Sequence, residues 1–98
     1  MIDKKKFYIN GQWVSPKNPK EIQVIDPATE KNCAVISLAG AEDVNAAVTA
    51  AKKAFETWEF TSKEERVKLL EDLYVLYKKR WADIAEAITL EMGAPKDF

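Results

Sequence analysis

Residues 7–14 read FYINGQWV, and this stretch has the pattern of a complete β-hairpin. Asn10-Gly11 is the strongest short-range hairpin signal, because a type I′ turn needs positive φ at both central residues. A two-residue loop at this point places Tyr8 opposite Trp13 on neighbouring strands. Both faces of the hairpin then carry large apolar side chains, so both are expected to contact other parts of the protein.

Two further short strands are expected after the hairpin. Residues 22–25 form an apolar run that ends at the turn dipeptide Asp26-Pro27, and residues 33–38 form a second apolar run. We expect antiparallel strands within about residues 7–38. The three lysines at positions 4–6 follow Asp3 near the chain terminus and predict a solvated tail.

The hydrophobic period becomes helical after residue 40. An alanine-rich apolar stripe runs from Val44 to Trp58 and predicts one helix. Its N-terminal cap is predicted to be poor, because Gly40 or Ala41 stands where Ser, Thr or Asp would cap better, at a cost of about 1 kcal/mol.

A second helix has a well-defined start. Residues 62–65 read SKEE, a capping box in which Ser62 and Glu65 satisfy each other's backbone N–H groups. Apolar residues then cover about half the helix circumference, more than the stripe of roughly 100° that a surface helix needs. The periodic pattern continues to Met92, which exceeds the usual helix length, so we expect a break near residues 79–83 and helices over about 42–92.

Composition excludes several classes of partner. The chain of 98 residues has 15 basic and 16 acidic side chains and a net charge of −1, so we expect no nucleic acid and no membrane surface as partner. No apolar stretch is long enough to cross a bilayer. Cys33 is the single cysteine, which fits a reducing cytoplasm, and its apolar neighbours predict a buried structural thiol.

The sequence contains few groups suited to catalysis. Histidine is absent, there is no G-x-G-x-x-G or Walker loop to bind a phosphate, and no Cys/His cluster could hold zinc. Cys33 as a nucleophile would need a base or a cation beside it. We therefore assign no catalytic residue and no cofactor-binding residue within this chain.

The order of five segments resembles the start of an aldehyde dehydrogenase. The segments are FYINGQWV at 7–14, VIDPATEK at 24–31, AEDVNAAVTAAKKAF at 41–55, ERVKLLEDL at 65–73 and EMGAP at 91–95. In that superfamily an F-I-N-G-x-W hairpin, an N-P-A-T-G-E turn, an alanine-rich helix, an R-x-x-L-L helix and an E-x-G-K-P turn follow one another. The chain departs from this pattern at Glu30, Lys31 and Ala94.

The resemblance implies an α+β fragment, with short antiparallel strands followed by two or three helices. Residues 1–98 would form the amino-terminal portion of an α/β, Rossmann-like cofactor-binding domain, with the catalytic and oligomerisation domains absent. The parent enzyme would oxidise an aldehyde to a carboxylic acid with NAD or NADP, through a cysteine thiohemiacetal. Cys33 does not match the catalytic motif, so this chain alone is expected to be inactive and to bind no cofactor.

The resemblance also implies partners and one partial site. The remainder of the dehydrogenase would cover the apolar hairpin and helix, which would otherwise drive self-association. The parent would be a homodimer or homotetramer. Some relatives bind a monovalent cation at positions that match the backbone carbonyl of Val24 or Ile25 and the side chain of Glu91, although Glu91 could equally face solvent. The alternative is a stand-alone binding or assembly module without catalysis.

Overall fold

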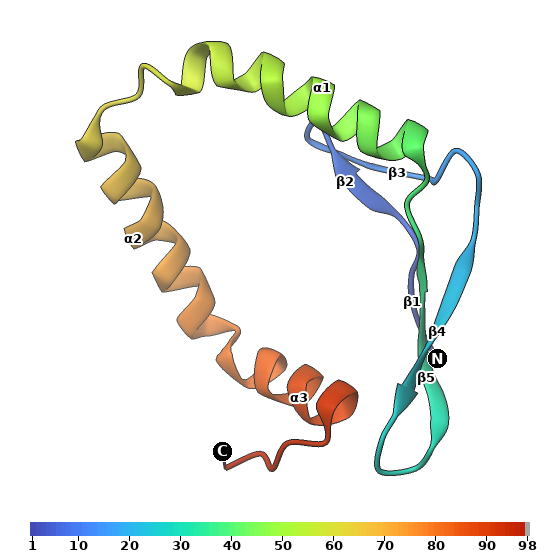
Figure 1. Cartoon of the computed structure of the whole chain (residues 1–98). Helices are drawn as coiled ribbons and strands as arrows, with labels where there is room; N and C mark the ends of the chain where they lie inside the picture. Colours follow the sequence, from blue (N-terminus) through green and yellow to red (C-terminus); the bar gives the residue numbers. More distant parts are fainter. Residues whose placement is uncertain (98) are drawn as a thin grey trace.

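The computed structural model describes residues 1–97, in which five short strands precede three helices. Figure 1 shows these elements as an open arc, with the strands on one side and α2 on the other. This order confirms the predicted succession of strands and helices. The elements are β1 Ile2–Lys4, β2 Phe7–Ile9, β3 Gln12–Val14, β4 Glu21–Asp26, β5 Lys31–Ser37, α1 Ala41–Trp58, α2 Lys63–Lys79 and α3 Trp81–Met92.

The hairpin β2–β3 forms as the sequence predicts. Asn10 has φ 52° and Gly11 has φ 75°, so both central residues adopt the left-handed conformation of a type I′ turn. Tyr8 pairs with Trp13 across the two strands, and their ring centroids lie 5.2 Å apart. The hairpin forms its own two-stranded sheet and contacts α1.

A separate three-stranded sheet has the order β1-β5-β4. β4 and β5 are antiparallel, whereas β1 runs parallel to β5 and places Ile2 opposite Ala34. Lys4 is exposed, as a solvated segment should be, but it ends β1, so the prediction that this part of the chain is only a tail is wrong. A parallel strand pair joins segments that are distant in the sequence, and the three-residue β1 has no alternating pattern to signal it.

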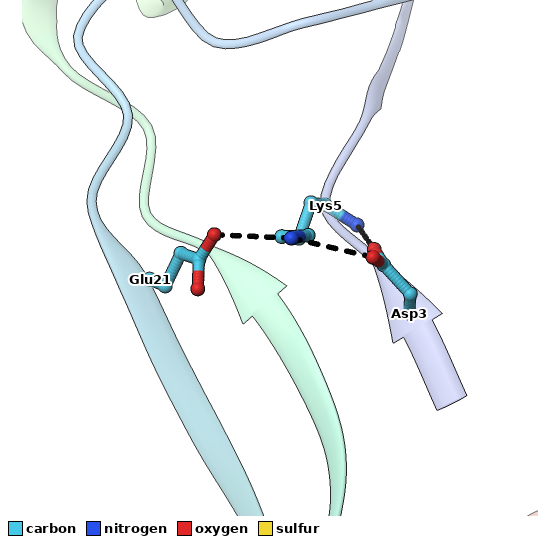
Figure 2. Close-up of polar contacts among 3 residues, drawn as sticks. All are labelled: Asp3, Lys5 and Glu21. Carbon is cyan, nitrogen blue, oxygen red and sulfur yellow. Dashed lines mark hydrogen bonds and ion pairs between the residues drawn. The ribbon is translucent and has the colours of Figure 1, made fainter. Parts of the chain in front are cut away.

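Lys5 connects the two outer strands of this sheet. Its Nζ lies 3.1 Å from Glu21 Oε1 on β4 and 3.3 Å from Asp3 Oδ2 on β1 (Figure 2). These contacts raise the pKa of Lys5, mainly through the hydrogen bond with Glu21 and then through the bond with Asp3. Part of the predicted tail is thus held by an exposed ion-pair network.

The turn between β4 and β5 is organised by Asp26. Its carboxylate accepts a hydrogen bond of 2.8 Å from the Ala28 N–H, and its carbonyl accepts one of 2.8 Å from the Glu30 N–H. Glu30 has φ 59°, a left-handed conformation that a glycine adopts more readily. A glutamate therefore stands in this chain at a backbone position that favours glycine.

The cap of α1 is stronger than the sequence predicts. Gly40 is the N-cap residue and has no side chain to accept a hydrogen bond. Asp43, three residues later, accepts a 3.0 Å bond from the Gly40 N–H and another of 3.0 Å from the Lys17 N–H. The prediction of a poor cap is wrong because Asp43 supplies the acceptor from inside the first turn.

The second helix begins and ends where predicted. Glu65 N–H donates to Ser62 Oγ at 3.1 Å and Ser62 N–H donates to Glu65 Oε2 at 2.7 Å, which confirms the capping box. Arg80 separates α2 from α3, with φ −107° and ψ 13°, and so confirms the break expected near residues 79–83.

Arg66 holds the corner between α1 and α2. Its guanidinium donates to Thr61 Oγ1 at 2.9 Å and to the Trp58 carbonyl at 3.1 Å. It also lies 5.4 Å from the centroid of the Trp58 ring, within the range of a cation–π contact. One side chain thus satisfies a carbonyl at the C-terminus of α1 and orients the start of α2.

The arc encloses almost no core of its own. Its radius of gyration is 17.3 Å, whereas a compact domain of this length has about 13 Å. Its principal extents are 48 × 37 × 15 Å, so the chain is flat. Among residues 1–97, Ala34 is the single buried apolar residue. Secondary structure is therefore well formed locally, while its apolar side chains lack a second layer to pack against.

Candidate functional site

The residues predicted to bind a cation lie at neighbouring ends of β4 and α3. Ile25 is on β4 and is 48% exposed, and Glu91 lies exposed in the last turn of α3. α3 contacts β4, and a Cβ atom added at Gly93 would lie 3.2 Å from Pro27 Cγ. The fold thus brings the turn after β4 close to the end of α3, as a shared site would require.

The cleft between these two elements has a different lining from the predicted site. Asp26, Asp83, Glu86 and Lys96 supply its charged groups, and Lys96 Nζ pairs with Glu86 Oε1 at 3.7 Å. Within residues 1–97, no three His, Cys, Asp or Glu side chains gather as metal ligands would. A cation held by Ile25 and Glu91 would therefore need ligands from elsewhere.

Cys33 lies in β5 and is half-buried. Its Sγ donates a 3.4 Å hydrogen bond to the carbonyl of Val24 on β4. The contact is compatible with the structural role predicted for the thiol, but the prediction that Cys33 is buried is wrong, because its side chain is only half-buried. The same bond engages the Val24 carbonyl, one of the two carbonyls considered as cation ligands.

An exposed apolar surface without an assigned role lies along α2 and the first residue of α3; seven of its eight side chains are on α2 and cover about half of that helix. We call this surface the α2 apolar arc; each of its members is 44–65% exposed. At about 100° per residue, the opposite half carries charged residues and one apolar residue, Val75. The members of the arc are Val67, Leu69, Leu70, Leu73, Tyr74, Leu76, Tyr77 and Trp81.

This arrangement is suited to binding a protein surface. Contiguous exposed apolar side chains of this extent mark interaction sites in folded proteins. Two residues that hold the helices in place were not identified from the sequence: Asp43 at the start of α1 and Arg66 at the corner between α1 and α2. Asp43 has a detectable signal, an acidic residue three positions after the N-cap, whereas the contacts of Arg66 depend on the corner between two helices.

Comparison with known proteins identifies the family. Residues 13–98 match the sequence profile described as the Aldehyde dehydrogenase family. The chain belongs to the aldehyde dehydrogenase family. Among curated relatives of this aldehyde dehydrogenase chain, a 3-succinoylsemialdehyde-pyridine dehydrogenase from a Pseudomonas species is 50% identical over 95 residues. That alignment covers 97% of this chain and 20% of the relative.

Solved structures of aldehyde dehydrogenases contain the same arc. The crystal structure of an aldehyde dehydrogenase from Bartonella henselae matches 99% of this chain with a TM-score of 0.97 and 52% identity. A mutant aldehyde dehydrogenase C from Pseudomonas syringae, in complex with NAD+ and octanal, matches 94% with a TM-score of 0.91 and 42% identity. The match covers 20% and 19% of those chains.

This aldehyde dehydrogenase chain thus spans about one fifth of the length of the relatives it matches. The matched part is their amino-terminal portion, in agreement with the resemblance in the sequence. In the part of the chain that the structure describes, no helix is both long enough and apolar enough to span a membrane.

Proposed function

We propose that this chain is the amino-terminal segment of an NAD(P)-dependent enzyme that oxidises an aldehyde to a carboxylic acid. The segment supplies outer strands and helices of the cofactor-binding domain. The observation that carries the proposal is the TM-score of 0.97 over 99% of this chain to one fifth of an aldehyde dehydrogenase. A likeness this close, at 52% identity, supports a common role for the segment in both proteins.

Catalysis in the proposed enzyme depends on residues outside this chain. A cysteine thiolate elsewhere in the polypeptide would add to the aldehyde to form a thiohemiacetal, and bound NAD or NADP would supply the hydride acceptor that converts it into a thioester. Water would then hydrolyse the thioester, releasing the carboxylic acid and the free thiolate. The relative from Pseudomonas syringae in complex with NAD+ and octanal supports both the cofactor class and the substrate class. We assign the segment alone no catalytic role: Cys33 does not match the catalytic motif, and its Sγ donates a hydrogen bond to the carbonyl of Val24.

The test is an assay of the full-length protein with a panel of aldehydes and with each of NAD+ and NADP+. Formation of reduced nicotinamide that depends on both aldehyde and cofactor is the expected result, and residues 1–98 alone should give none. A full-length protein that oxidises no aldehyde in the panel would contradict the proposal. In that case a stable native product of residues 1–98 would favour a binding or assembly module.

We further propose a monovalent cation near the Ile25 carbonyl and Glu91 in the full-length enzyme. The support is the approach of α3 to β4 and to Pro27. Glu91→Ala should weaken the dependence of activity on potassium, whereas Glu86→Ala on the same helix serves as the control. Equal potassium dependence in the wild type and in Glu91→Ala would exclude this role.

The proposed enzyme is a cytoplasmic homodimer or homotetramer. The single free cysteine is compatible with a reducing compartment. Light scattering on the full-length protein after size-exclusion chromatography measures the oligomeric state directly. A monomeric mass would contradict the proposed assembly without affecting the proposed reaction.

A further inference from the structure

The chain exposes far more surface than a compact protein of its mass. Its accessible surface is 8498 Å², whereas a folded monomer of 11.1 kDa exposes about 5,700 Å². The excess is therefore about 2,800 Å². Domains normally bury such surface by packing two layers of secondary structure together, and this flat arc lacks the second layer.

α2 contributes a large set of exposed apolar side chains to this surface. The α2 apolar arc spans about half of the helix, and within it Leu70 is 65% and Leu73 is 59% exposed. The opposite half carries charged residues, including Lys68 and Asp72, which form an ion pair. One half of α2 is therefore suited to burial against another apolar surface, and the other half is suited to contact with water.

The size of the surplus helps to identify the partner. A standard protein–protein interface buries about 800 Å² on each partner, so a simple pairing of two copies would leave most of the excess uncovered. The whole chain, and not only α2, matches a solved structure: the alignment covers 99% of this chain and 20% of the Bartonella henselae aldehyde dehydrogenase. The conformation is thus that of a segment held by the rest of one polypeptide.

We propose that the α2 apolar arc is an obligate-type docking surface for the remaining part of the dehydrogenase, and that this docking does not require a continuous backbone. The inference rests on the proposed function and names the partner of this segment. The excess of about 2,800 Å² of accessible surface is more than three times the roughly 800 Å² that each partner buries in a standard interface, and it is of the size found in permanent interfaces. Residues 1–98 and the rest of the enzyme should therefore remain associated after the peptide chain is cut between them.

The experiment uses the full-length enzyme with a specific protease site inserted directly after residue 98. The folded protein is cleaved, and the two pieces are followed by size-exclusion chromatography in native buffer. We expect them to elute together, to separate in denaturant, and to associate again when the denaturant is removed. Separation of the wild-type pieces in native buffer would overturn the proposal.

A matched pair of variants localises the interaction. Leu73→Asp lies on the α2 apolar arc and Val75→Asp on the charged half, and the two native side chains are similarly exposed at 59% and 53%. We expect Leu73→Asp to weaken association of the cleaved pieces at least about tenfold, since it places a charge in an apolar contact. Val75→Asp should change it by less than about twofold. Equal effects of the two variants on association would overturn the assignment of the α2 apolar arc as the docking surface.

A milder variant covers the case in which Leu73→Asp does not fold. Leu73→Ala keeps the helix and removes only buried apolar contact, so it should still weaken association by about tenfold or more. Association is measured by elution, independently of catalysis. An uncut enzyme that oxidises no aldehyde would contradict the proposed function, whereas an active enzyme whose pieces separate would contradict only this inference.

Discussion

Replacing Asp43 with alanine tests the hydrogen bonds of the most buried polar side chain among residues 1–97. Asp43 is 4% exposed, and its carboxylate accepts hydrogen bonds from the backbone N–H groups of Gly40 and Lys17. The first bond caps α1, and the second ties the loop between β3 and β4 to the same helix. Asp43→Ala removes both acceptors and leaves two part-buried donors without a partner.

The expected cost follows from these two bonds. A hydrogen bond to a charged group contributes about 1.5–3 kcal/mol, and two bonds to one carboxylate are not additive. We therefore expect the local free energy of opening to fall by about 2–4 kcal/mol. Since about 1.4 kcal/mol corresponds to a factor of ten, amide exchange at these positions should accelerate from about 30-fold to several hundred-fold.

Hydrogen exchange followed by mass spectrometry on the full-length enzyme measures this effect. Peptides that contain Lys17 and Gly40 should exchange faster in Asp43→Ala, while peptides from α3 should not change. Glu42→Ala is the matched control, because Glu42 is exposed in the same helical turn and contributes only its charge near the helix N-terminus, worth about 0.3–1 kcal/mol. If both variants exchanged at the same rate, the bridging role of Asp43 would be refuted.

Two further predictions concern α2. Arg66→Lys keeps the charge but loses the fork that contacts Thr61 and the Trp58 carbonyl, so the α1–α2 corner should be cleaved faster in limited proteolysis of the full-length enzyme. The hydrogen bonds from Ser62, first from its backbone and then from its side chain, lower the pKa of Glu65 below its ordinary value of 4.5. The contribution of the capping box to stability is therefore complete above pH 4.5 and is lost as pH falls through the lowered pKa. Exchange rates at the start of α2 should rise over that acidic range.

Each of these predictions has its own control. Arg80→Lys lies at the other end of α2 and should leave cleavage at the α1–α2 corner unchanged, so equal cleavage of both arginine variants would contradict the role of Arg66. Glu65→Gln cannot ionise and should remove the acid dependence at the start of α2. If the dependence persisted in Glu65→Gln, another group would be responsible for it.

Local signals in the sequence determined most of the secondary structure. The Asn10-Gly11 turn, the capping box at Ser62 and the break at Arg80 each depend on residues that are neighbours in the chain, and all three are present in the structure. Their energies come from backbone conformation and short-range hydrogen bonds, which a short sequence window contains. The hydrophobic period likewise predicted which half of α2 is apolar.

The candidate cation site was predictable only in part. The family resemblance pointed to Ile25 and Glu91, and the contact between α3 and β4 brings their surroundings together. The two residues do not form a ligand set by themselves, because a monovalent cation in a protein needs several oxygen ligands. The completeness of such a site depends on chain segments that no local pattern in residues 1–98 contains.

Tertiary structure alone decided the contacts between distant segments. The parallel pairing of β1 with β5, the bond from Lys17 to Asp43 across 26 positions and the bridge from Lys5 to Glu21 have no local pattern that identifies their partners. Such contacts form only after strands and helices have taken their places, because each bond gains free energy only once both partners are already held near one another. The sequence by itself therefore determined the family of this aldehyde dehydrogenase segment and most of its helices and strands. The strand β1, the open shape of the chain and the exposed apolar surface of α2 follow from how those elements meet.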